Sequence, residues 1–589
     1  MRRKINKSAM WGRACLTASL IILSTSAEMA GSDNRIASPV IAGPAKISND
    51  LAGKKNLGQV DVIVQYKVVP TAVEHSKVTS RGGVLKTNLG NFKGGAYRMP
   101  ASAVSDLAGD PDVVYISPDR PLRGAGSNIS LDYHNETINA STAWSQNLTG
   151  AGIGVAVIDS GIASVPDLAN TMVYSQDFTG IGSASDQYGH GTHVAGIIAG
   201  NGAESSAWYA DYTFQGVAQD VNLVNLRVLD QNGAGTDSEV IAAIEQAIAL
   251  KNTYNIRVIN LSLGRPVFES YTADPLCQAV EQAWKAGIVV VAAAGNDGRD
   301  NAYGTNGYGT IEAPGNDPYV ITVGAMNTLG SPNRSNDVPA SYSSKGPTVL
   351  DHVIKPDLVA PGNLTISLYF SSETLNQESP TNEVSRNLYL WAKNYGSSPY
   401  YFALSGTSMA TPMVSASAAI LLQNSSTLTP DQVKARLMQS SFKNLVQYST
   451  ATDPATGITY YEQADIFTVG AGLLDIQGAL NDNYVAPSAV GSALSPVAAV
   501  DSSGNIVLKA NGTSVLGSNS VLWGTSVLWG TSVFSGSDVS GSSVLWGTSV
   551  CCASSTMQSD SVLWGTSVLW GTSSTTADSA SALINGDAN

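Results

Sequence analysis

The sequence predicts an α/β fold, a parallel β-sheet with helices on both faces, preceded by a small α+β unit and followed by a low-complexity repeat tail. Three near-continuous apolar runs rich in β-branched residues, at 152–159, 256–264 and 287–296, support the parallel sheet. Such runs are typical of strands that are covered on both faces. Helix signals lie between the runs, as expected for strands that alternate with helices.

The helix signals can be placed individually. Thr236 can cap a helix over 236–251, because Glu239 stands at the position that completes a capping box. A second helix is expected over 277–286, and a third begins near Thr407. At Thr429-Pro430 the threonine caps a helix and the proline occupies its first turn.

Length and composition limit the possible functions. The 589 residues exceed the roughly 250–300 that one core supports, so several modules are expected. With 43% hydrophobic and 13% charged residues, the chain has enough apolar material for a packed core. A net charge of −14 disfavours nucleic-acid binding, and the four cysteines show no metal-binding spacing.

The N-terminus is typical of an exported protein. Residues 1–27 combine basic residues, an apolar run over 14–23 and small residues at 24–27, which together predict a signal peptide. The apolar run is about half the length of a membrane-spanning helix, so an anchor is the less favoured alternative. We therefore expect a secreted protein, with the periplasm or the cell surface as other possible locations. The polar, small residues at 28–58 are predicted to form a linker.

A small α+β unit is predicted over 59–123. The alternating sequence from Val60 is a strand, 104–108 is a short helix, and 113–116 is a second strand.

Three segments contain residues suited to nucleophilic catalysis. Asp159 ends a predicted buried strand, where open parallel sheets bind ligands, and His190 and Ser408 begin predicted helices. A hydroxyl nucleophile needs a base within hydrogen-bond reach, and a carboxylate that orients this base. Taken singly, each residue could instead have a structural role, as a turn cap, a satisfied histidine or a helix cap. His193 is interpreted as structural.

The motifs around these residues are VIDSGI, GHGTHVAG, AAAGN and GTSMATP, in this order. They resemble the four signature blocks of the subtilisin-like serine proteases, and the likeness spans about residues 138–482. The order Asp, His, Ser agrees with that family, whereas the G-x-S-x-G elbow of α/β-hydrolases is not satisfied at Ser408. The resemblance implies an endopeptidase that acts through an Asp159–His190–Ser408 triad and an acyl-enzyme intermediate.

The resemblance also implies roles for further residues. Asn296 would supply the side-chain donor of an oxyanion hole, together with the backbone N–H of Ser408. Glu312 would lie near the base of the primary specificity pocket and favour Lys or Arg before the cut, unless its carboxylate points into solvent. The remaining substrate-binding candidates are Ser262, Leu263 and Gly264 for pairing with extended substrate, and Ala292, Ala293 and Gly295 as pocket walls.

Maturation and metal binding follow from the same resemblance. The unit at 59–123 resembles the family's propeptide, which assists folding and then inhibits the enzyme until it is cleaved, so an autoprocessed precursor is implied. Asp167 matches a ligand of structural calcium, although the loop from Asn201 departs from the usual calcium loop. No cofactor is required for the chemistry, and the expected partners are protein or peptide substrates and the propeptide itself.

The tail over 487–589 is rich in Ser, Gly, Thr and Val, and contains the hexapeptide VLWGTS five times. If a copy is extended, its even period places Val, Trp and Thr on one face. The alternatives are disorder, association with a surface or with itself, and a folded domain. We expect the tail to be dispensable for peptide cleavage. A non-catalytic surface or matrix-binding protein and an esterase are the competing functions.

Overall fold

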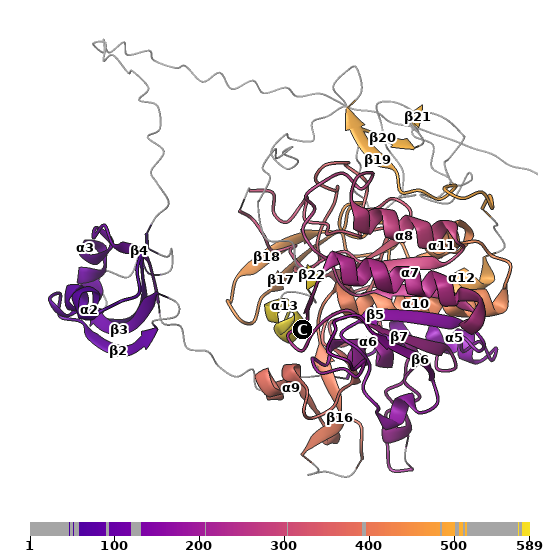
Figure 1. Cartoon of the computed structure of the whole chain (residues 1–589), viewed down its shortest axis with the longest axis horizontal. Helices are drawn as coiled ribbons and strands as arrows, with labels where there is room; N and C mark the ends of the chain where they lie inside the picture. Colours follow the sequence, from indigo (N-terminus) through magenta and orange to yellow (C-terminus); the bar gives the residue numbers. More distant parts are fainter. Residues whose placement is uncertain are drawn as a thin grey trace, which may run out of the picture. The chain divides into compact units, whose positions relative to one another are not determined.

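The computed structural model describes the chain in two compact units, Met1–Leu122 and Arg123–Asn589 (Figure 1). The predicted signal peptide, nearly all of the predicted linker and all five VLWGTS copies lie outside the described residues. The described residues are 46–47, 51, 58–89, 93–118, 131–206, 208–302, 304–391, 396–482, 486–500, 506–510, 513–514, 575–576 and 580–588.

The N-terminal unit is a four-stranded antiparallel sheet in the order β2-β3-β1-β4. The strands are β1 (Gln59–Tyr66), β2 (Val84–Leu89), β3 (Gly94–Pro100) and β4 (Val113–Pro118), and the helices are α2 (Ala72–Thr79) and α3 (Val104–Ala108). The alternating side chains Val62 and Val64 enter a core with Tyr97 and Leu107. The small α+β unit predicted from the sequence is therefore present, with one helix and two strands more than the pattern indicated.

The larger unit is built around an eight-stranded sheet, in the order β12-β11-β10-β9-β5-β7-β6 with β13 paired to β11. Every neighbouring pair is parallel except β11 with β12. Its strands are β5 (Gly154–Asp159), β6 (Met172–Asp177), β7 (Asn222–Arg227), β9 (Ile256–Leu261), β10 (Val289–Ala293), β11 (Ile321–Asn327), β12 (Val338–Pro339) and β13 (Leu358–Pro361).

Helices cover both faces of this sheet, as predicted. Along the chain, α6 (His190–Ala199) connects β6 to β7, α7 (Asp237–Tyr254) connects β7 to β9, and α8 (Pro275–Lys285) connects β9 to β10. The helices α7 and α8 pack against each other and against the sheet, and α10 (Thr407–Asn424) packs with α6 as a second pair.

The predicted helix boundaries are close to those observed. Thr236 and Glu239 form the expected capping box of α7. Thr429 caps α11 (Pro430–Ser440), which has the proline at its first position. The smaller helices are α4 (His134–Thr137), α5 (Ala140–Trp144), α9 (Thr374–Glu378) and α12 (Ile476–Asn481).

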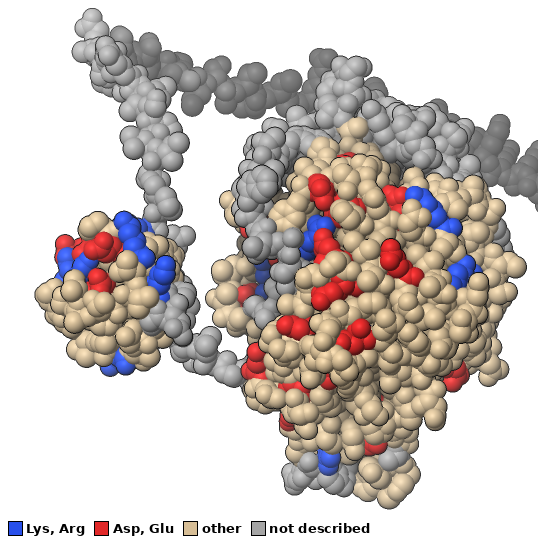
Figure 2. Space-filling view, viewed as in Figure 1, with Lys and Arg blue, Asp and Glu red and all other residues tan. Residues whose placement is uncertain are grey.

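Two smaller sheets lie after the main one in sequence. The strands β14 (Thr365–Leu368), β16 (Ser397–Leu404) and β15 (Glu383–Ser385) form one sheet, and β17 (Tyr448–Thr452) pairs with β18 (Thr459–Gln463). On the face shown in Figure 2, acidic side chains are scattered over the larger unit, in keeping with the acidic excess of the sequence. Within the described ranges, no helix has both the length and the apolar character needed to cross a bilayer.

The packed part of the larger unit continues beyond residue 482, the predicted end of the catalytic domain, into the segment where the tail was expected to begin at 487. Residues 486–500 pack on the larger unit, where Ala486, Ala493 and Ala498 belong to its core. Their strand β19 (Val497–Val500) pairs with β20 (Ile506–Ala510), which in turn pairs with β21 (Thr513–Ser514). The composition was misleading because small residues such as Ala and Ser form close buried contacts here.

The end of the chain also returns to this unit. The strand β22 (Thr575–Thr576) pairs antiparallel with β8 (Ala234–Gly235), and the helix α13 (Ala580–Asn585) contacts β16. Leu583 is fully buried in the main core.

Candidate active site

The carboxyl end of β5 and the start of α6 bring together the first two predicted catalytic residues. Asp159 Oδ1 lies 2.8 Å from His190 Nδ1, and both side chains are buried. A carboxylate accepts hydrogen bonds, so the proton of a neutral His190 is on Nδ1 and its Nε2 is basic. Gly191 permits this approach, since a Cβ there would lie 2.2 Å from the carbonyl oxygen of Gly161.

Ser408 is the second residue of α10 and is fully buried. Its hydroxyl donates to the carbonyl oxygen of Ser262 at 3.0 Å, and Ser262 Oγ donates to the carbonyl oxygen of Ser408 at 2.9 Å. Two further bonds extend this connection, from Asn260 Nδ2 to Ser262 Oγ and from Ser415 Oγ to Asn260 Oδ1. The end of β9 therefore fixes the position of the segment that contains Ser408.

Asn296 lies beside the start of the same helix. Its Oδ1 accepts from the backbone N–H of Thr407 at 2.9 Å, which fixes the amide orientation because an N–H can only donate. Its Nδ2 is buried, and no acceptor among the described residues is within hydrogen-bond distance. A buried donor without an acceptor costs roughly 1–3 kcal/mol, so Asn296 presents a donor that an arriving oxygen could satisfy.

The predicted substrate-binding residues lie around the ends of β9 and β10. Glu312 is half-buried, and its side chain lies over two glycines. A Cβ on Gly264 would lie 2.4 Å from Glu312 Oε2, and a Cβ on Gly295 would lie 2.7 Å from Glu312 Cγ. The carboxylate is therefore held between the two strand ends. The other candidates, Ser262, Leu263, Ala292 and Ala293, are buried in or next to these strands.

Both carboxylate oxygens of Asp167, the residue that matches a calcium ligand, accept hydrogen bonds from protein groups. Its Oδ1 accepts from the backbone N–H of Glu204 at 2.9 Å, and its Oδ2 accepts from the Tyr401 hydroxyl at 2.7 Å. Burial raises the pKa of Asp167, so the buried site disfavours the charged form of this carboxyl group. Among the described residues, no group of three or more His, Cys, Asp or Glu side chains could hold a metal ion.

His193 has the structural role that the sequence indicated. Its Nε2 lies 3.1 Å from the carbonyl oxygens of both Thr365 and Phe402. Burial lowers the pKa of His193 to about 3, so the imidazole is neutral and donates from Nε2.

Sequence reasoning missed Asp186, which organises the turn before His190. Its carboxylate accepts from the Ser160 hydroxyl at 2.9 Å, from the Gly189 N–H at 2.9 Å and from the Thr192 hydroxyl at 2.7 Å. Burial raises the pKa of this carboxyl. No local capping pattern indicated this role, because the N-cap of α6 is Gly189 and Asp186 stands three residues earlier.

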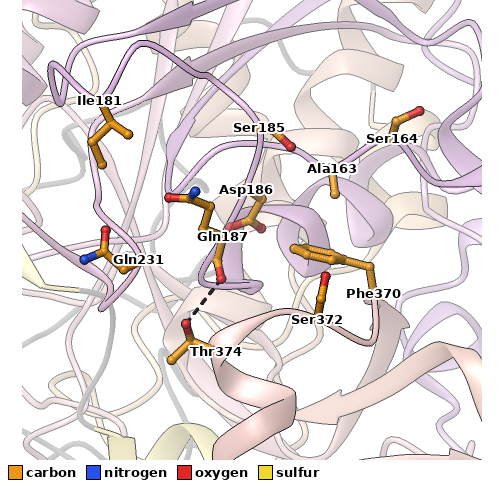
Figure 3. Close-up of a pocket in the computed structure, with 10 residues that line it drawn as sticks. All are labelled: Ala163, Ser164, Ile181, Ser185, Asp186, Gln187, Gln231, Phe370, Ser372 and Thr374. Carbon is orange, nitrogen blue, oxygen red and sulfur yellow. Dashed lines mark hydrogen bonds between the residues drawn. The ribbon is translucent and has the colours of Figure 1, made fainter.

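Glu373 was also missed, and it directly precedes α9. Its side chain is buried, and a Cβ on Gly189 would lie 2.4 Å from Glu373 Cδ. Burial and the nearby Asp186 raise the pKa of Glu373 to about 9. Phe370, Ser372 and Thr374 line the pocket of Figure 3 together with Asp186 and Gln187. Within this lining, Thr374 Oγ1 donates a hydrogen bond to the carbonyl oxygen of Gln187.

The parallel α/β sheet, the buried Asp–His pair and the serine at a helix start define a serine hydrolase. Residues 150–479 match the subtilase family of peptidases. The chain is 38% identical over 304 residues to serine protease AprX of Bacillus subtilis (strain 168), a match that covers 51% of this chain and 63% of AprX. It is 32% identical over 440 residues to subtilisin E of the same organism, covering 74% and 94%. The extracellular serine proteinase of Thermus sp. (strain Rt41A) is 32% identical over 379 residues, covering 62% and 74%.

The chain therefore belongs to the subtilase family, and it is a serine-type endopeptidase.

Proposed function

We propose that Asp159, His190 and Ser408 form the catalytic triad of this endopeptidase. The observation that carries the proposal is the buried 2.8 Å hydrogen bond between Asp159 and His190, which leaves His190 Nε2 basic. In the reaction, Ser408 Oγ attacks the scissile carbonyl carbon as its proton passes to His190 Nε2. Asp159 holds the imidazole in the required tautomer and stabilises the imidazolium that forms.

The tetrahedral oxyanion is stabilised by Asn296 Nδ2 and by the backbone N–H of Ser408. The buried Nδ2 without an acceptor among the described residues supports this role. A donor already fixed in a buried site stabilises the charge that develops without further reorganisation. The protonated His190 then gives its proton to the leaving amine, an acyl-enzyme remains on Ser408 Oγ, and water hydrolyses it by the same steps in reverse.

The primary pocket prefers Lys or Arg before the cut. The position of Glu312 over Gly264 and Gly295 supports this specificity, because a half-buried carboxylate pairs with an ammonium or guanidinium group. Protein and peptide chains are therefore the substrates, cut after basic residues.

The protein is exported and made as an autoprocessed precursor, with 59–123 as propeptide. The Thermus relative is an extracellular proteinase, which supports export. The match to subtilisin E extends over 440 residues, longer than the family domain at 150–479, which supports a propeptide before the domain.

Replacement of the nucleophile tests the proposal. Ser408→Ala should abolish hydrolysis of a chromogenic peptide, block covalent labelling by an organophosphonate and leave the precursor uncut. Ser426→Ala, at an exposed serine, is the matched control. Labelling mapped to any serine other than Ser408, or self-cleavage of Ser408→Ala at high dilution, would show that the triad is assigned wrongly.

A further inference from the structure

The edge strand β8 lies beside the catalytic pair. A Cβ on Gly233 would lie 2.5 Å from the Tyr188 ring, and the ring centroids of Tyr188 and His190 are 6.4 Å apart. Val228 donates its N–H to the carbonyl oxygen of Asp159, and a Cβ on Gly235 would lie 2.3 Å from the carbonyl oxygen of Val228. An extended peptide can add to a strand edge of this kind through main-chain hydrogen bonds.

The peptide that occupies this edge is the C-terminal segment of the chain itself. Thr575 pairs with Gly235 and Thr576 with Ala234, in antiparallel register. Only three residues separate Thr576 from Ala580, so the two docked parts lie within about 14 Å of each other along the chain.

The second docked part lies on the serine side of the site. The backbone N–H of Ser405, three residues before Ser408, donates to the carbonyl oxygen of Leu583 at 2.8 Å. A Cβ on Gly586 would lie 2.3 Å from Ser405 Oγ, so the chain passes directly over this residue. Asn382 Nδ2 donates to the carbonyl oxygen of Ile584 at 2.7 Å.

A built polar site holds the carboxylate of Asp587, which is fully buried. Oδ1 accepts from Ser341 Oγ at 2.5 Å and from Arg299 at 2.9 Å, and Oδ2 accepts from the Ser341 N–H at 2.7 Å. Asn363 recognises the backbone of the same residue, accepting from its N–H at 2.7 Å and donating to its carbonyl oxygen at 3.1 Å.

Arg299 is itself fixed in place. Its guanidinium lies 5.6 Å from the ring centroids of both Tyr342 and Tyr460, and it also donates to the carbonyl oxygen of Gly586 at 2.8 Å. The two rings hold the planar guanidinium group in one orientation. Arg299 therefore loses little conformational entropy when it binds a carboxylate. This arrangement is a binding site for a peptide with an aspartate near its C-terminus.

We propose that the C-terminal segment acts as an intramolecular inhibitor through its described residues 575–576, which dock on β8 at the histidine side, and 580–588, which Asp587 holds at the serine side. This inference rests on the proposed function, because it assigns regulation to the same active site. The segment competes with extended substrates for the strand edge. A tethered segment acts at an effective concentration of about millimolar, so even moderate intrinsic affinity keeps the site occupied.

Substitution of Asp587 in the full-length chain tests the proposal. Asp587→Ala removes the charge-assisted bonds to Arg299 and Ser341 and should raise kcat/KM on a short chromogenic peptide about tenfold, mainly through a lower KM. Asp220→Ala, at an exposed aspartate, is the matched control and should leave kcat/KM unchanged. Added peptide TTADSASALINGDAN, residues 575–589, should inhibit Asp587→Ala competitively, and the same peptide with alanine for its aspartate at 587 should inhibit more weakly.

A second variant covers the case in which Asp587→Ala fails to fold. Thr576→Pro disrupts the pairing with β8 without touching the Asp587 site, and it should also accelerate hydrolysis. Wild-type or slower hydrolysis by the folded variants, or no inhibition by the peptide, would overturn the proposal. Organophosphonate labelling separates the two hypotheses. Labelling of Ser408 at equal rates in all variants rejects only the inhibitor, whereas no labelling of Ser408 in any of them rejects the proposed function.

Discussion

Ser495→Ala should destabilise the larger unit, although residue 495 lies beyond the predicted end of the catalytic domain. Ser495 Oγ donates to Asp357 Oδ1 at 2.5 Å and accepts from Lys434 Nζ at 2.9 Å. All three side chains are buried. Burial raises the pKa of Asp357, but the ammonium groups of Lys355 and Lys434 outweigh it and hold this pKa below its ordinary value. Ser495 therefore completes the hydrogen bonding of buried ionised groups.

The expected loss follows from those contacts. A hydrogen bond to a charged group is worth about 1.5–3 kcal/mol. Alanine removes one such bond from Asp357, whereas Lys434 keeps its bonds to the carbonyl oxygens of Pro318 and Val320. We therefore expect the free energy of unfolding to fall by about 2–3 kcal/mol and the Tm by roughly 4–6 °C, at about 2 °C per kcal/mol for a large domain.

Thermal and urea unfolding, followed by circular dichroism in a Ser408→Ala background that prevents self-digestion, measure this loss. Ser206→Ala, at an exposed serine, is the control. Equal stability of Ser495→Ala and Ser206→Ala would refute the argument. The same contacts revise the expectation that the tail is dispensable, because a chain that ends near Tyr484 lacks Ser495 and should unfold more readily than the full-length protein.

Three further predictions concern the active site and its surroundings. Asn296→Ala should lower kcat by roughly 10²- to 10³-fold with little change in KM, the range known for removal of one oxyanion donor from a related subtilisin, and a larger effect on KM would argue against the role. Glu312→Gln should reduce the preference for Lys and Arg before the cut in a peptide-library profile, and an unchanged profile would mean that the carboxylate does not contact substrate. Glu373→Gln should flatten the pH dependence of stability between about pH 5 and 9. The pKa of Glu373 is about 9 in the folded state, above its unfolded value, so its contribution is full below the unfolded pKa and is lost as the pH rises toward 9. Parallel stability curves for wild type and Glu373→Gln from pH 5 to 9 would contradict this.

The fold of the larger unit was predictable because its sequence signals are local. The apolar runs at 152–159, 256–264 and 287–296 correspond to β5, β9 and β10, with ends that differ by up to three residues. A short, near-continuous apolar run of this kind is typical of a strand that is buried on both faces, so few other elements fit the sequence. The helix α2 was missed although Thr71 and Glu74 form a capping box, since the helix has only eight residues and little apolar periodicity.

Residues of the candidate site were predictable for a related reason. Asp159, His190 and Ser408 stand at the end of a strand or the start of a helix, where motif and element boundary coincide. The partners that the sequence did not reveal are far apart in the chain: Asp357 and Ser495 by 138 residues, Ser341 and Asp587 by 246. No local pattern encodes such a contact, because each partner looks like an ordinary polar residue in its own segment.

The C-terminal segment shows the same limit most directly. Its sequence from Ala580 to Ala588 is small and polar, as expected of a solvated tail, and only Leu583 and Ile584 interrupt that composition. Leu583 is nonetheless buried in the core, and Asp587 is buried against Arg299. The segment contains too few apolar residues to fix its own position. The pairing with β8 and the ion pair between Asp587 and Arg299 hold it, so its position depends on the residues against which it docks. Substitutions at Arg299 or Ser341 should therefore release the segment as Asp587→Ala does, and wild-type labelling of Ser408 in folded Arg299→Ala and Ser341→Ala would show that this site does not hold it.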